Sequence, residues 1–112
     1  MTQTATKPKS FQPLPVKQVA PIIFGLCKRA HYRSEVLSLF DLKHTLQGRT
    51  NGRQFPAYRV EEAIAALVNL GALVQQGEES KSDLTLFYEV NMAWNTPEIA
   101  DAVADLLSQG AT

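Results

Sequence analysis

The chain has 112 residues, with 11 basic and 11 acidic side chains and a formal net charge of zero. Its length suits one domain around one modest core. No apolar run approaches the roughly 20 residues that cross a bilayer, residues 1–15 contain no apolar signal-peptide core, and the single cysteine, Cys27, cannot form an internal disulfide. We therefore expect a soluble cytoplasmic protein that neither spans a membrane nor depends on disulfides.

The first half of the chain predicts an arm, a helix and a second, shorter helix. Residues 1–15 are expected to form a flexible basic arm, because Lys7, Lys9 and three of the six prolines lie among polar residues. Residues 16–31 predict a helix whose apolar face is made by Val19, Ile22, Ile23, Leu26 and Ala30, with Pro21 tolerated near the first turn. Phe24 lies away from that face, which indicates either a contact surface or closure over the core.

A short strand and helix are predicted next. Residues 36–39 provide the strand, and Asp41 is expected to cap a helix that ends near Leu46, with Leu42 and Leu46 facing inward. Residues 48–56 are expected to be a long turn. At the other end of the chain, Thr96 as N-cap and Pro97 at the first helical position predict a helix over residues 96–112. Its apolar face is made by Ile99, Val103, Leu106 and Leu107.

The most informative segment is residues 58–90. Val60, Ile64, Leu67 and Val68 follow the spacing of one helical face over residues 58–70, and Gly71 suits a left-handed helix end. An apolar strand over 72–76 and an alternating strand over 84–90 follow, separated by a polar loop. In the second strand, one face is expected to carry Leu84, Leu86, Tyr88 and Val90.

The order of these elements is helix, glycine, strand, polar loop and strand, and at its centre are Leu67, Leu70, Gly71, Leu73 and Val74. This pattern resembles the recognition helix and wing of the winged helix-turn-helix superfamily. The resemblance implies an α+β fold: a three-helix core with a β-hairpin wing over residues 16–95. The helix over 96–112 is then an addition that closes the core or supports a homodimer. The turn over 48–56 departs from the pattern, because a plain helix-turn-helix has a turn of about 3–4 residues.

Charge is strongly segregated along the chain. Residues 1–60 contain ten bases and two acids, whereas residues 61–112 contain one base and nine acids. Because phosphate binding responds to local positive potential, the basic half favours double-stranded DNA as a partner. The alternative is that the bases solvate one face, or that the two halves attract each other within one molecule or between subunits.

DNA binding in a regulatory setting is therefore the leading expectation. The candidate DNA-contacting residues are Lys43, Arg49, Arg53, Tyr58, Arg59, Asn69 and Lys81. The outer side of the helix over 58–70 is expected to display Tyr58, Arg59, Glu62, Ala65, Ala66 and Asn69. Glu62 and the net acidic loop over 75–83 disfavour close phosphate contact, so a protein partner on the face of Tyr58, Glu62, Ala65 and Asn69 is the alternative.

Catalysis and cofactor binding are not expected. Cys27 and His31 are four residues apart and could combine with His44 and Asp41, but a structural zinc site has paired cysteines or histidines at sharper spacing. Cys27 and His31 also lack a third group to orient a nucleophile. The sequence contains no glycine-rich phosphate loop before a helix. We therefore expect neither an enzyme nor a metal or cofactor site.

Overall fold

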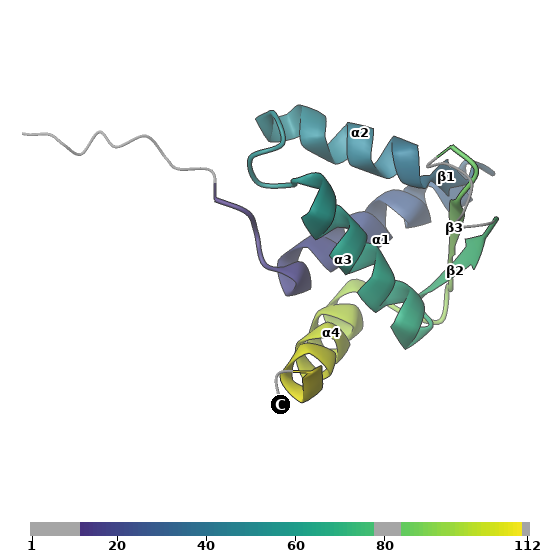
Figure 1. Cartoon of the computed structure of the whole chain (residues 1–112). Helices are drawn as coiled ribbons and strands as arrows, with labels where there is room; N and C mark the ends of the chain where they lie inside the picture. The colour runs from purple at the N-terminus through teal and green to yellow at the C-terminus, as the bar shows by residue number, and fades with distance from the viewer. Residues whose placement is uncertain (1–11, 78–83, 111–112) are drawn as a thin grey trace, which may run out of the picture.

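The computed structural model describes residues 12–77 and 84–110, and within them four helices pack together with a small sheet at one side (Figure 1). The elements are, in chain order, α1 (Val16–Tyr32), β1 (Leu37–Ser38), α2 (Leu39–Thr50), α3 (Ala57–Leu70), β2 (Leu73–Gln76), β3 (Phe87–Val90) and α4 (Thr96–Gly110). The three strands are antiparallel in the order β1-β3-β2. This α+β arrangement is compatible with a winged-helix layout. No helix in the described part of the chain is long and apolar enough to cross a membrane.

Helix α1 lies at the centre of the packing and contacts α3, α4 and β3. Val19, Ile23 and Ala30 are buried, as their spacing predicts. Phe24 lies away from that stripe, and of its two predicted roles closure over the core is confirmed, because its side chain is completely buried. A helix that is covered on more than one side buries a wider arc than a single apolar stripe.

Helix α2 begins earlier and ends later than predicted. Its N-cap is Ser38, not Asp41: the Ser38 hydroxyl accepts from the Asp41 N–H, and the Asp41 carboxylate accepts from the Ser38 N–H, each at 3.1 Å. This reciprocal capping box puts Asp41 inside the first turn. The helix continues through Gly48, whose helical cost is only about 1 kcal/mol, and ends at Asn51 with φ 55°. The connection to α3 is therefore residues 51–56 and not the predicted 48–56.

Helix α3 and its glycine end are confirmed. Val60, Ile64 and Leu67 are buried, and Gly71 has φ 84° and ψ 8° while its N–H donates to the Val68 carbonyl. One expectation for the outer face is wrong: Ala66 is only 6% exposed. It borders the start of α1 and the end of α4, which cover that side of α3.

The hairpin is confirmed but is shorter than predicted. Among the described residues, the strand pairing runs from Leu73 with Val90 to Gln76 with Phe87. Leu86, Tyr88 and Val90 are buried on the predicted face, whereas Leu84 lies outside the strand and is 61% exposed. The polar tip over 78–83 lies outside the described residues.

Helix α4 packs against α1 and α3 and buries Ile99 and Val103 completely, so it helps to close the core. Its N-cap is Asn95, not Thr96, because the Asn95 side-chain oxygen accepts from the Glu98 N–H at 3.1 Å. Pro97 is therefore one position further into the helix than predicted. Leu106 is partly buried and Leu107 is 44% exposed, so the predicted apolar face is covered only in its first half.

Candidate nucleic-acid interface

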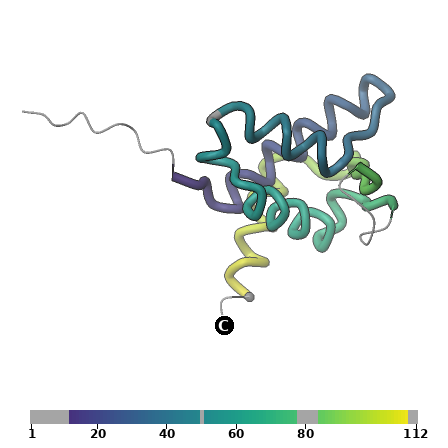
Figure 2. The backbone as a smooth tube through the Cα atoms, turned by 45° about the horizontal axis from the view of Figure 1, so that its top comes forward, coloured from purple at the N-terminus to yellow at the C-terminus, as the bar shows by residue number. Residues whose placement is uncertain are grey.

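Four segments lie together at one end of the molecule (Figures 1 and 2): the end of α2, its connection to α3, the start of α3 and the start of α1. The Leu14 N–H donates to the Gln54 carbonyl at 3.2 Å, which ties the segment before α1 to the α2–α3 connection. Exposed bases gather here from three segments: Lys17 from α1, Arg49 from α2 and Arg53 from the connection. We call these three residues the basic end.

Two helix N-termini reinforce the positive potential of the basic end. Helices α1 and α3 begin after Pro15 and Pro56, and neither has a side-chain cap or an acidic residue in its first turn. The first N–H groups of an α-helix have no partner within the helix, and the aligned peptide dipoles make that end positive. Both helix starts therefore favour an anion at the same end as the three bases.

Among the predicted DNA-contacting residues, Lys43 and Arg59 each lie close to a carboxylate of α3. The Lys43 ammonium lies 2.6 Å from the Glu61 carboxylate, and the Lys43 side chain is only 16% exposed. The Arg59 guanidinium lies over the Tyr58 ring at 5.4 Å, and its Nε is 3.7 Å from Glu62. The outer side of α3 is thus close to electrically neutral.

The other predicted residues are not all brought together. Tyr58 is exposed beside the basic end, but Asn69 is exposed near the opposite end of α3, about 16 Å away along the helix at roughly 1.5 Å per residue. Lys81 lies outside the described residues. Lys17, which the sequence reasoning missed, joins Arg49 and Arg53 because the start of α1 folds against the α2–α3 connection. Its membership in the basic half of the chain was the only available signal.

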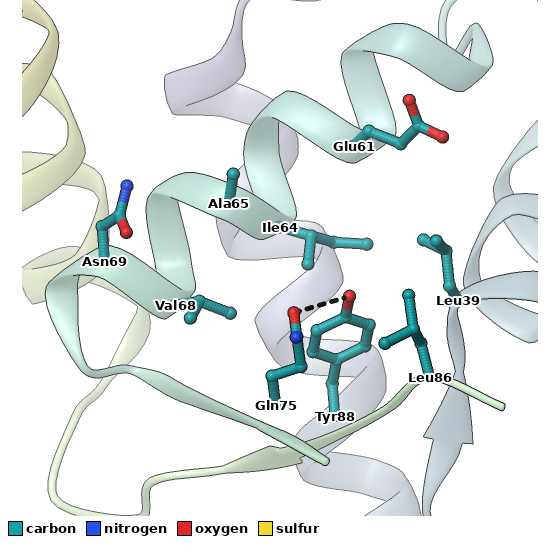
Figure 3. A pocket seen from close by; sticks show the side chains of 9 residues that line it. All are labelled: Leu39, Glu61, Ile64, Ala65, Val68, Asn69, Gln75, Leu86 and Tyr88. Carbon is teal, nitrogen blue, oxygen red and sulfur yellow. Dashed lines mark hydrogen bonds between the residues drawn. The ribbon is translucent and has the colours of Figure 1, made fainter. Parts of the chain in front are cut away.

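A groove with a volume of about 420 Å³ lies between α3 and the sheet, and we call it the sheet-side groove (Figure 3). Ile64, Leu86 and Tyr88 make its apolar floor, and the Tyr88 hydroxyl donates to the Gln75 side-chain oxygen at 3.3 Å. Glu61 and Asn69 lie at its polar edge on α3. An apolar floor with a few polar groups at the edge suits an amphipathic ligand or peptide.

A second groove, of about 510 Å³, lies on the other side of α3, and we call it the α4-side groove. It is lined by small or apolar side chains from α1, α3 and α4, together with Arg59, Glu62 and Asn69. Ala65 and Asn69 line both grooves, so the exposed part of α3 is a ridge between two hollows. Sequence periodicity does not reveal either groove, because each is bounded by side chains from distant segments.

The residues considered as metal ligands or nucleophiles do not form a site. In residues 12–77 and 84–110, no group of three or more His, Cys, Asp or Glu side chains could hold a metal ion. Burial raises the pKa of the Cys27 thiol to about 12, so the nucleophilic thiolate is not formed near neutral pH. His31 packs edge-on against Tyr32 at 5.8 Å, and His44 stacks on Phe40 at 5.7 Å.

Comparisons with known proteins do not assign the chain to a class: no protein-family model matches it, and no curated protein or solved structure matches it significantly.

Proposed function

We propose that this protein is a winged-helix DNA-binding protein, either a transcriptional regulator or another non-enzymatic DNA-associated factor. The observation that carries the proposal is the convergence of Lys17, Arg49 and Arg53 with two uncapped helix N-termini at one end of the fold. Cationic side chains and helix N-termini are the groups that contact backbone phosphates in protein–DNA complexes. Binding of the DNA phosphate backbone at the basic end accounts for the charge segregation of the chain.

Phosphate contacts contribute more than base contacts in this proposal. Glu61 and Glu62 lie on the exposed side of α3. Glu61 is close to Lys43 and Glu62 is close to Arg59, so these two basic side chains are already engaged with carboxylates of the protein. Carboxylates near phosphates are repelled, so deep entry of α3 into the major groove is unfavourable. Tyr58, at the start of α3 beside the basic end, is the best placed of the predicted residues to reach a base edge.

Salt-dependent binding of a fluorescent DNA duplex tests the proposal. Replacing the three bases of the basic end by alanine should weaken binding to every duplex. It should also make the slope of log K against log salt shallower by about 3, because each lost phosphate contact releases roughly one counterion fewer. Fluorescence anisotropy over a salt series measures both quantities.

A matched control removes three basic side chains at the C-terminal end of α1, one of which belongs to its C-cap residue, Arg33. The variant Lys28→Ala/Arg29→Ala/Arg33→Ala has the same change in charge, and Arg29 lies about 18 Å from Lys17 along the helix. This control should keep most of the wild-type affinity. Equal losses in the two triple variants would leave only a diffuse charge effect, and no duplex binding by the folded wild type at low salt would refute the proposal.

A second candidate function is protein docking on the face made by Tyr58, Glu62, Ala65 and Asn69. The sheet-side groove favours it, because an apolar floor beside an exposed alanine suits close packing of another chain. Ala65→Arg should abolish capture of such a partner while leaving the buried side of α3 intact. If the wild type binds no duplex and Ala65→Arg loses no co-purifying protein, neither function stands.

A further inference from the structure

Helix α4 has more apolar surface than its own core covers. Ile99, Val103 and Leu106 make the inner stripe, of which the first two are completely buried. A second stripe with the same helical spacing is made by Ala100, Ala104 and Leu107, and it adjoins the first. The two alanines are half-buried and Leu107 is 44% exposed.

The second stripe borders the α4-side groove. Leu107 lines that groove together with Leu106, and the opposite wall is made by the small side chains Ala65 and Ala66 of α3. One continuous patch therefore has both a projecting leucine, Leu107, and small side chains that leave room for another, which are Ala100 and Ala104 on α4 and Ala65 and Ala66 on α3. A two-fold symmetric interface uses the same patch on both subunits, so it requires projections and hollows within one patch.

We infer that a second copy of this chain covers this face, with the two α4 helices packed antiparallel across a two-fold axis near Ala104. Leu107 of each copy then packs beside Ala100 of the other copy, where the small side chain allows the close helix approach of about 8–10 Å. The inference does not rest on DNA binding.

The charges at the groove fit this arrangement. Arg59 lines the groove next to the end of α4, and its side chain is 25% exposed although its Nε lies 3.7 Å from Glu62. The exposed acids Glu98 and Asp101 lie near the start of α4. In an antiparallel pair the start of one α4 lies beside the end of the other, so Asp101 of the second copy approaches Arg59. A carboxylate there pairs with the exposed part of the Arg59 guanidinium.

Site-directed crosslinking tests the position of the two-fold axis. Ala104→Cys should give a covalent dimer with a short bis-maleimide, because a residue near the axis faces its own copy. Asp105→Cys is the matched control, since the next residue points about 100° away around a helix with 3.6 residues per turn. Cys27 does not interfere because it is 3% exposed and protonated, and the wild type should stay uncrosslinked. No dimer from Ala104→Cys, or equal dimer from both variants, overturns the arrangement.

Sedimentation equilibrium without DNA tests the dimer itself. The wild type should be a reversible dimer, and Leu107→Glu should raise the dimer dissociation constant more than about tenfold, as expected for a central apolar contact. Val74→Glu is the control. Val74 is 51% exposed on the face of the sheet that points away from the core, so this substitution should leave the dimer unchanged. A wild type that stays monomeric at high concentration, or equal loss in the two variants, refutes the inference. Neither result bears on DNA binding.

Discussion

Gly71 should be required for the turn from α3 into β2, and Gly71→Ala should destabilise the fold. Its φ of 84° and ψ of 8° lie in the left-handed region, where an L-residue brings its Cβ close to the following carbonyl. A Cβ built at Gly71 meets no other atom within 4 Å. The expected cost is therefore conformational alone, about 1–2 kcal/mol.

Gly→Ala changes at two other glycines should give effects on stability on either side of that value. A Cβ at Gly25, inside α1, also meets open space but sits on a helical backbone, so Gly25→Ala should stabilise the protein by about 0.5–1 kcal/mol. At Gly77, φ is 102° and a Cβ would collide with the Thr85 backbone carbonyl across the neck of the hairpin. Gly77→Ala should therefore cost more than Gly71→Ala, because the backbone must shift as well.

Urea unfolding followed by far-UV circular dichroism measures these differences in the free energy of unfolding. The expected order of stability is Gly25→Ala, wild type, Gly71→Ala and Gly77→Ala, with similar slopes against urea for the first three. A Gly71→Ala protein as stable as the wild type would refute the reasoning, since α3 would then end without a left-handed residue.

Two further predictions concern a buried thiol and a helix cap. Burial raises the pKa of Cys27 from 9.0 to about 12. The folded state therefore retains a thiol proton that the unfolded state loses above pH 9. The free energy of unfolding falls as pH rises from 9 to 12 for this reason. From pH 8 to pH 10 the wild type should lose about 1.4 kcal/mol more than Cys27→Ala, measured by urea unfolding at each pH; parallel pH profiles would contradict this. Asn95→Ala should lower stability by about 1 kcal/mol because it removes the N-cap of α4, whereas Thr96→Ala should be nearly neutral. Thermal unfolding of the two variants measures this difference. A larger loss of stability in Thr96→Ala would show that Thr96 is the cap.

Local sequence determined those elements whose signals lie within a few neighbouring residues. The spacing of Val60, Ile64 and Leu67 follows from the 3.6-residue period of a helix that needs one buried face, and Gly71 ends it because only glycine adopts positive φ without cost. The alternation of Leu86, Tyr88 and Val90 likewise follows from the two-residue period of a strand.

Tertiary structure decided what depends on residues far apart in the chain. Phe24 and Ala66 are buried because helices from distant segments cover them, and Ser38 caps α2 at the point where β1 pairs with β3. The sequence predicted Lys43 and Arg59 as DNA-contacting residues, but folding brought Glu61 to Lys43, and the helical turn set Glu62 beside Arg59. Both grooves and the basic end arise in the same way, because a surface is made by whichever side chains the packed helices leave uncovered.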